Sequence, residues 1–133
     1  MSRVAALRCV RGGKSVTTDH FAERFAAVRE RFAAKLDSRI EEIEAAVPEF
    51  GSDGEAGMEA RARAHRRAHD LCGIGPTMGF VATGKQARTV EQLLLAPIKA
   101  GRALTSAEIV RLCEEIAGLR SAARADIAPT GQE

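Results

Sequence analysis

The side chains best suited to chemistry lie on one segment, His65-Arg66-Arg67-Ala68-His69-Asp70-Leu71-Cys72-Gly73. A neutral imidazole has a free lone pair on one ring nitrogen at cellular pH, because its pKa lies near 6.5. His69 is therefore a candidate nucleophile that needs no buried base. Arg66, one helical turn earlier, offers a fixed positive charge close to that ring. This pair suits phosphoryl chemistry, in which positioning and electrostatics supply most of the catalysis.

The spacing of small and apolar residues predicts a helix from about Glu55 through this segment. Its buried face is marked at intervals of four and three positions by Ala64, Ala68, Leu71, Gly75 and Met78. His69 then lies roughly 130° from the centre of that face, on the solvent side. Arg66 and Gly73 point almost directly away from the core, and His65 and Cys72 lie at the edges of the buried face. The sequence therefore predicts an exposed imidazole with a cleared surface beside it.

Glycine and proline shape the end of this helix. Gly73 places no side chain in the path of a partner that approaches His69. Pro76 follows Gly75 and should distort the final turn, because its ring removes one backbone hydrogen bond. Gly79 is a natural position for the helix to end.

A longer helix is predicted before the one that carries His69, with a single apolar stripe whose residues recur at intervals of four and three positions. Thr18 or Asp19 can cap its start, and Pro48 closes it. At 1.5 Å per residue this helix would be roughly 40 Å long. The stripe comprises Phe21, Phe25, Val28, Phe32, Leu36, Ile40, Ile43 and Val47.

Two further helices complete the predicted fold. One spans roughly residues 82–96 and ends at Pro97 and Gly101, with its core side at Ala87, Val90, Leu93 and Leu94. The other begins with the capping box Thr105-Ser106-Ala107-Glu108 and continues the stripe Ile109, Leu112, Ile116, Leu119 and Ala123. Short connections favour antiparallel neighbours. We therefore predict an all-α, antiparallel up-down four-helix bundle over residues 17–126, with a flexible tail at 1–16 and a second tail at 127–133.

Composition agrees with one small helical domain. The chain has 133 residues, is 45% hydrophobic and lacks Trp and Tyr. A net charge of +2 is too small to indicate a nucleic-acid or membrane partner. Three cysteines at unrelated spacings (Cys9, Cys72 and Cys113) imply no disulfide framework, and Cys113 is expected in the core. The start of the chain is too broken by arginine to be a signal peptide, so a cytoplasmic protein is predicted.

The motif around His69 resembles the histidine phosphotransfer (HPt) domain of bacterial two-component phosphorelays. The resemblance covers the helix that carries His69 closely and the bundle around it in outline, about residues 20–125. Matching positions are His69, Leu71, Gly73, Gly75, Thr77, Gly79 and Phe80. The chain departs at Cys72, where a lysine is common, at Ile74, where a small polar residue is common, and at Pro76.

The resemblance implies a phosphorelay intermediate without autokinase activity. His69 would accept the phosphoryl group, and Arg66 would replace the usual lysine as its stabiliser, with Lys85 and Arg88 as weaker candidates. The implied partners are response-regulator receiver domains and a hybrid sensor histidine kinase, which would dock around His65, Cys72 and Gly73. No cofactor is implied, Mg²⁺ is expected only in the receiver, and the chain is expected to be a monomer.

Other interpretations of the same residues are weaker. His65 and His69 can chelate a metal from one helical face, but no further ligand cluster is evident, so we predict no metal site. Cys72 can be a reactive thiol or a packing residue. Gly12-Gly13-Lys14-Ser15 is not a phosphate loop, since Arg8 stands where that motif needs glycine.

Two interpretations concern whole surfaces. Basic residues on the second helix (Arg61, Arg63, Arg66 and Arg67) suit a docking surface for an acidic receiver better than a nucleic-acid site, because no aromatic platform accompanies them. The competing functional class is a degenerate HPt-like or coiled-coil interaction module, in which the long first helix pairs with a partner helix and His69 is incidental.

Overall fold

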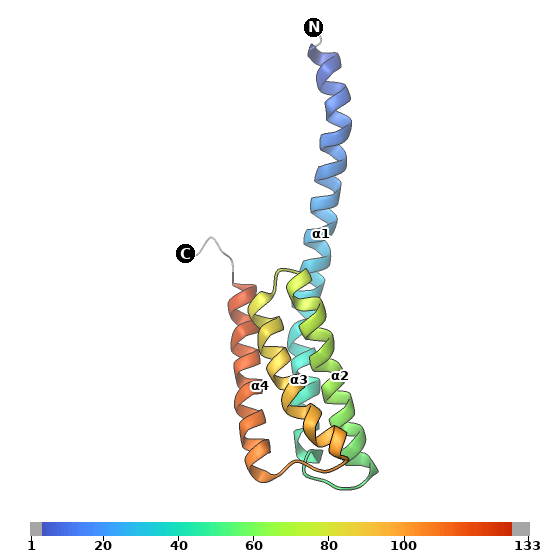
Figure 1. Cartoon of the computed structure of the whole chain (residues 1–133). Helices are drawn as coiled ribbons and strands as arrows, with labels where there is room; N and C mark the ends of the chain where they lie inside the picture. Colours follow the sequence, from blue (N-terminus) through green and yellow to red (C-terminus); the bar gives the residue numbers. More distant parts are fainter. Residues whose placement is uncertain (1–3, 129–133) are drawn as a thin grey trace. The chain divides into compact units, whose positions relative to one another are not determined.

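The computed structural model describes the backbone of residues 4–128 and the side chains of residues 20–128. Four α-helices and one short 3-10 helix follow one another along this part of the chain (Figure 1). They are α1 (Val4–Ala46), η1 (Val47–Glu49), α2 (Glu55–Thr77), α3 (Val81–Ala100) and α4 (Ser106–Ile127). The predicted all-α four-helix fold is confirmed. None of the described helices is both long and apolar enough to cross a membrane.

The chain divides into two compact units, residues 1–34 and 35–133. In the first unit, α1 begins at Val4, so the predicted caps at Thr18 and Asp19 are wrong. No proline lies between Val4 and Ala46, and the helical backbone continues through both positions. The predicted flexible tail over residues 1–16 stays a prediction.

The first half of the predicted apolar stripe is exposed. Phe21 is 71% exposed, and Phe25 and Val28 are each 40% exposed. The described part of the first unit is a single helix, and one helix alone cannot cover its own apolar face. Phe21, Phe25 and Val28 are therefore left uncovered in the described part of this unit.

The second unit contains the core. The end of α1 contributes Leu36, Ile40, Ile43 and Ala46, all buried. Ion pairs fasten this part of α1 to its neighbours: Arg67 of α2 pairs with Glu42. From α4, Arg120 pairs with Glu44 at 2.6 Å and with Asp37 at 3.7 Å.

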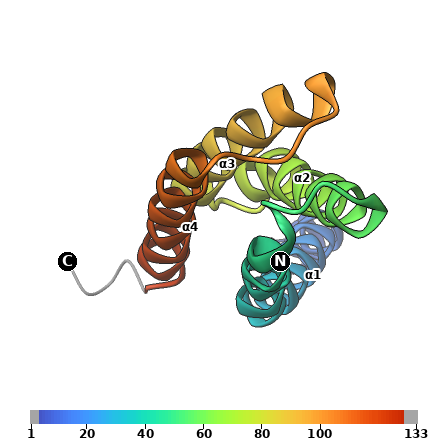
Figure 2. The same ribbon diagram turned by 90° about the horizontal axis from the view of Figure 1, so that it is seen from below.

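Helix α3 lies between α2 and α4 (Figure 2). Helices α2 and α3 approach each other closely near the end of α2, where Gly75 and Gly84 face each other. A Cβ atom at Gly75 would lie 3.4 Å from the Gly84 Cα, and one at Gly84 would lie 2.7 Å from the Pro76 ring. Pro76 thus fits into a space that only glycine at position 84 leaves open, and α2 and α3 are held close together.

The C-terminal ends of α2 and α3 follow the predicted signals with one exception. Helix α2 ends at Thr77, and Gly79 then adopts a φ of 86°, as its glycine predicts. For α3, the predicted end near residue 96, before Pro97, is wrong, whereas the predicted stop at Gly101 is confirmed. Pro97 is buried inside the last turns, and the helix ends only at Gly101, whose φ is 65°.

The capping box of α4 is confirmed. The Glu108 amide donates to the Thr105 hydroxyl oxygen at 3.1 Å, and the Thr105 amide donates to the Glu108 carboxylate at 2.8 Å. Arg102 also binds both oxygens of that carboxylate, at 2.9 and 3.0 Å. These contacts fix the start of α4 and the loop before it.

Two residues lie where the sequence did not place them. Arg61 was predicted on a docking surface but is only 2% exposed, and its Nη1 donates to the carbonyl oxygens of Phe50 (3.2 Å) and Ser52 (2.8 Å). Phe50 itself is fully buried. Cys113 was predicted in the core but is exposed, because α4 turns Leu112 and Ile116 inward instead. Arg61 is therefore a structural residue that holds the loop after η1.

Candidate functional site

His69 stands on the solvent side of α2, where the helical spacing placed it. Its side chain is 67% exposed, while its neighbours Ala68 and Leu71 are buried against the core. A Cβ atom at Gly73, one turn later, would meet nothing within 4 Å. The surface next to the imidazole is therefore open to an approaching protein.

Glu91 of α3 fixes the orientation and tautomer of His69. Its Oε2 lies 2.6 Å from the imidazole Nδ1, and its side chain is only 17% exposed. An ionised carboxylate can only accept hydrogen bonds, so Nδ1 must be the protonated nitrogen. In the neutral ring, Nε2 then has the free lone pair. This contact therefore leaves the lone pair on Nε2.

The charges of Glu91 and Cys72 are coupled. Burial acts to raise the pKa of Glu91, but hydrogen bonds from His69 and Cys72 outweigh it, so the pKa is lowered from its ordinary value. The Cys72 thiol donates to Glu91 Oε1 at 3.5 Å. Burial first, and Glu91 second, raise the pKa of that thiol. Glu91 is therefore an anion and Cys72 a neutral thiol at pH 7.

His65, one turn before His69, is less exposed, with a side-chain exposure of 23%. Its ring stacks on that of His69, with centroids 6.4 Å apart and planes 9° from parallel. Its Nε2 is 3.8 Å from Glu91 Oε2, too far for a hydrogen bond. That nitrogen is shielded from solvent and has no hydrogen-bond partner among the described residues. The site thus contains one ring nitrogen that the fold does not satisfy.

The basic residues around His69 differ in whether they are already ion-paired. Arg66 is exposed and lines a shallow hollow of about 330 Å³ together with His65, His69, Asp70 and Glu91. Arg67 is already engaged by Glu42 and Asp70. Lys85 and Arg88 are exposed on α3, and the charge of Arg88 acts on the Cys72 thiol. The predicted stabiliser Arg66 therefore lines the hollow next to His69. Arg88 lies near enough to Cys72 for its charge to act on the thiol.

The remaining motif positions support the helix that carries His69. Leu71, Gly75 and Phe80 are buried, and the Phe80 amide donates to the Gly75 carbonyl at 2.7 Å. The Thr77 hydroxyl donates to the Gly73 carbonyl at 3.5 Å. These residues shape the end of α2 and do not touch the imidazole.

Sequence reasoning missed Glu91. A weak signal was present, since Glu91 directly follows Val90 and lies one turn after Ala87, both predicted on the core side of this helix. A carboxylate at the edge of a buried stripe needs a polar partner. Only the packing of α3 against α2 shows that the partner is His69.

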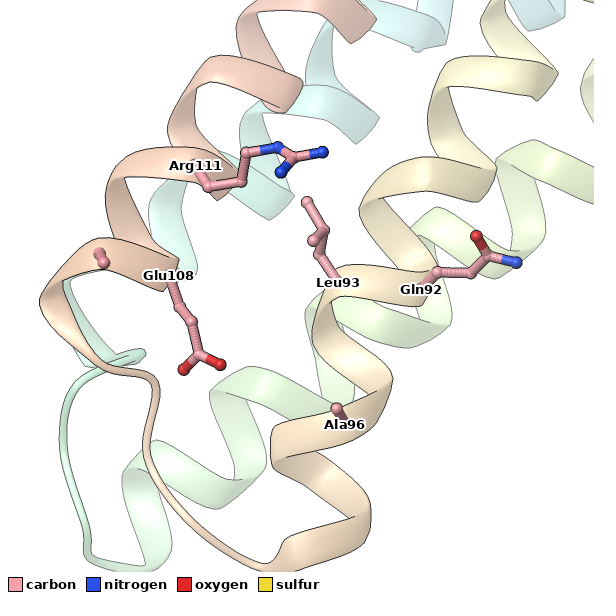
Figure 3. Close-up of a pocket in the computed structure, with 6 residues that line it drawn as sticks. Gln92, Leu93, Ala96, Glu108 and Arg111 are labelled. Carbon is pink, nitrogen blue, oxygen red and sulfur yellow. The ribbon is translucent and has the colours of Figure 1, made fainter.

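A second hollow, of about 320 Å³, lies between α3 and α4 and is less suited to chemistry. In Figure 3, Leu93 of α3 extends toward Arg111 of α4. The charged side chains that line this hollow already have partners: Arg111 pairs with Glu115 at 3.2 Å, and Glu108 is bound by Arg102. The group of reactive side chains around His69 has no counterpart in this second hollow.

The fold and the site together define a helical bundle in which an exposed histidine, His69, is oriented by a carboxylate from the adjacent helix. Comparison with known families agrees with this class. The model of the Hpt domain family matches residues 27–122, so the chain belongs to the Hpt domain family. Hpt domains take part in histidine phosphotransfer in phosphorelays and act as carriers, in contact with receiver domains and kinases. No curated protein and no solved structure matches this chain.

Proposed function

We propose that this protein is a phosphorelay intermediate that carries a phosphoryl group on Nε2 of His69. The observation that supports this most directly is the 2.6 Å contact between His69 Nδ1 and Glu91. It holds the proton on Nδ1, so the lone pair lies on Nε2 of a side chain that is 67% exposed. A carrier needs such a nitrogen, since it must reach into the active site of another protein.

The transfer step follows from this tautomer. Nε2 attacks the phosphorus of a receiver's phospho-aspartate, the N–P bond forms, and the bond from phosphorus to the aspartate oxygen breaks with its electron pair. The receiver's carboxylate leaves, and the ring, still protonated on Nδ1, becomes positively charged. The Glu91 carboxylate stabilises that charge through the hydrogen bond already in place. Transfer to a second receiver is the reverse of these steps.

Arg66 is proposed to stabilise the phosphoryl oxygens, and Mg²⁺ is proposed to come only with the receiver. Arg66 is exposed, lines the same hollow as His69, and has no ion-pair partner in the described part of the chain. The proposed docking patch comprises Arg66, Gly73 and the rims of His65 and Cys72. Ile74, which is 43% exposed, adds an apolar contact next to Gly73. A charged rim around a small apolar centre is typical of transient protein contacts.

The partners and the location complete the proposal. We propose that the donors and acceptors are receiver domains, including that of a hybrid sensor histidine kinase, that the chain has no autokinase activity, and that it works in the cytoplasm without a cofactor of its own. The sequence contains no nucleotide-binding signature, which supports a carrier that is phosphorylated by others.

Phosphotransfer profiling tests the proposal. Purified receiver domains, each phosphorylated by its own kinase, are mixed with the wild type, His69→Gln and His20→Gln. The expected result is rapid, acid-labile labelling of the wild type and of His20→Gln, and none of His69→Gln. His20 is the matched control because it is an exposed histidine on α1 that lies outside the proposed docking patch. Equal labelling of His69→Gln and the wild type would refute the proposal.

One observation favours the alternative function, a helical interaction module. Phe21, Phe25 and Val28 are exposed on α1 and follow one another at helical spacing. Such a stripe can pair with another helix. The carrier proposal includes a monomer, and sedimentation at several concentrations distinguishes the two. If no receiver transfers a phosphoryl group and the chain self-associates through these residues, the interaction module is the better description.

A further inference from the structure

Three side chains with metal-binding atoms, those of His65, His69 and Cys72, surround the Glu91 carboxylate. His69 Nδ1, Cys72 Sγ and a Glu91 oxygen all lie within 4.8 Å of one another. Glu91 Oε2 is 2.6 Å from His69 Nδ1, and Oε1 is 3.5 Å from Cys72 Sγ. On the buried side, His65 Nε2 is 3.8 Å from Oε2 and has no hydrogen-bond partner among the described residues. His69, Cys72 and Glu91 thus form one cluster of ligand atoms, and the His65 imidazole lies beside a carboxylate oxygen of that cluster.

This donor set matches zinc. Zinc prefers four ligands in tetrahedral geometry, with bonds of about 2.0–2.1 Å to histidine nitrogen and about 2.3 Å to cysteine sulfur. Ca²⁺ and Mg²⁺ prefer sites made of oxygen ligands, whereas this site offers one carboxylate beside two imidazoles and a thiolate. Ligand atoms around a zinc ion are about 3.4 Å apart, from those bond lengths. The distances of 2.6, 3.5 and 3.8 Å bracket that value.

The backbone already holds these ligands together. His65, His69 and Cys72 occupy successive turns of α2, anchored by the buried residues Ala68 and Leu71. Glu91 comes from α3, which approaches α2 closely at Gly75 and Gly84. The exposed His69 ring needs only a small rotation to open its contact with Glu91 to a metal-binding distance. Little ordering is therefore required when a metal binds.

We propose that His65, His69, Cys72 and Glu91 bind one zinc ion, and that bound zinc prevents phosphorylation of His69. Zinc takes the lone pair of Nδ1, so the single proton of the neutral His69 ring moves to Nε2. The thiol proton of Cys72 leaves to solvent, and the thiolate and Glu91 neutralise the two positive charges of the ion. Nε2 then has no lone pair to attack phosphorus. Zinc binding does not depend on the proposed carrier function, whereas the inhibition rests on it.

Cobalt provides a direct test of the site, because Co²⁺ bound by a thiolate gives a sulfur-to-metal charge-transfer band in the near ultraviolet. The full chain, with Cys9→Ser to remove the thiol outside the described side chains, is titrated with Co²⁺ and then with Zn²⁺ against a chromophoric chelator. Cys113→Ser is the matched control, since Cys113 is an exposed cysteine on α4.

The expected result is a charge-transfer band in the parent and in Cys113→Ser, and no band in Cys72→Ser. Zinc affinity should fall more than tenfold in each of Cys72→Ser, Glu91→Gln and His65→Gln. The three variants change different elements of the site, so misfolding of one, visible by circular dichroism, leaves the others informative. Equal zinc affinity of the parent and these variants would overturn the site, as would a band that disappears in Cys113→Ser.

Inhibition is tested with phosphoramidate, a small phosphoryl donor that needs no receiver and no Mg²⁺. One equivalent of Zn²⁺ should reduce labelling of His69 more than tenfold, and Cys72→Ser should be labelled equally with and without zinc. Unchanged labelling of a zinc-filled parent would overturn the inhibition. Failure of the parent to be labelled in metal-free buffer would count against the proposed function, and the cobalt band would still establish the zinc site.

Discussion

Helix α2 contains two polar sites, eight residues apart, that use their side chains in opposite ways. Arg61 is 2% exposed, and its guanidinium donates to two backbone carbonyls of the preceding loop. His69 is 67% exposed, with one nitrogen bound to Glu91 and the other left with a lone pair. The Arg61 guanidinium is used to hold the backbone of the loop, whereas His69 keeps a lone pair on Nε2 that can react with a partner. Charge or polarity alone therefore does not distinguish a structural residue from a functional one on this helix.

The largest effect on stability is expected at Arg61. Arg61→Met should lower the free energy of unfolding by about 3 kcal/mol, because the Ser52 carbonyl loses its donor and the buried loop loses its anchor. Urea denaturation followed by circular dichroism measures this. Arg66→Met is the control on the exposed face and should change stability by less than about 0.5 kcal/mol. Similar losses in both variants would show that the two regions do not differ as described.

The next largest effect is expected on the rate of transfer. Glu91→Gln keeps the size of the side chain but removes the charge that stabilises the phosphorylated ring. Phosphoryl transfer to His69 should slow about tenfold, equivalent to ~1.4 kcal/mol, since a hydrogen bond to a charged acceptor is replaced by a neutral one. Rapid-quench kinetics with one phosphorylated receiver measures the change. Gln92→Glu, an exposed neighbour on α3, should leave the rate unaltered.

A smaller effect, dependent on pH, is expected at the start of α4. The hydrogen bond from Arg102, with the backbone contact to Thr105, lowers the pKa of Glu108 to about 2 from 4.5. A lowered carboxyl pKa means that the stabilisation is present above pH 4.5 and is lost as the pH falls toward 2. Because this carboxylate is 35% exposed, we expect about 1 kcal/mol or less.

Comparison of the wild type with Glu108→Gln tests this pH dependence. Glutamine can still complete the capping box, so only the charge is removed. Thermal denaturation should show a stability difference at pH 7 that disappears near pH 2. A difference that persists at pH 2 would mean that shape rather than charge stabilises the cap.

The smallest effect on stability is expected for His69 itself. His69→Gln should change the free energy of unfolding by less than about 0.5 kcal/mol, because the side chain is exposed and its amide can still donate to Glu91. Denaturation of this variant beside Arg61→Met gives the sharpest test of the comparison. A loss above 2 kcal/mol would assign His69 to the fold.

The sequence predicted those features that depend on residues close together along the chain. The exposed face of His69, the open surface at Gly73 and the capping box of Thr105 and Glu108 all follow from spacing within a few turns. Glu91, in contrast, meets His69 only because α3 packs on α2, and no local pattern specifies that partner. The burial of Arg61 depends in the same way on the path of the loop from Phe50 to Ser52. The start of α1 was missed because a helix without a strong stop signal can extend beyond its expected cap.

The contact between Pro76 and Gly84 has a consequence for how this chain could change during evolution. Any side chain at position 84 would bring a Cβ atom to 2.7 Å from the Pro76 ring, so Gly84→Ala is costly while the proline is present. Replacement of Pro76 by a residue without a ring removes that conflict. The two positions can therefore diverge in one order only: proline must be lost first and glycine second. Among descendants of this protein, proline at position 76 should always occur together with glycine at position 84.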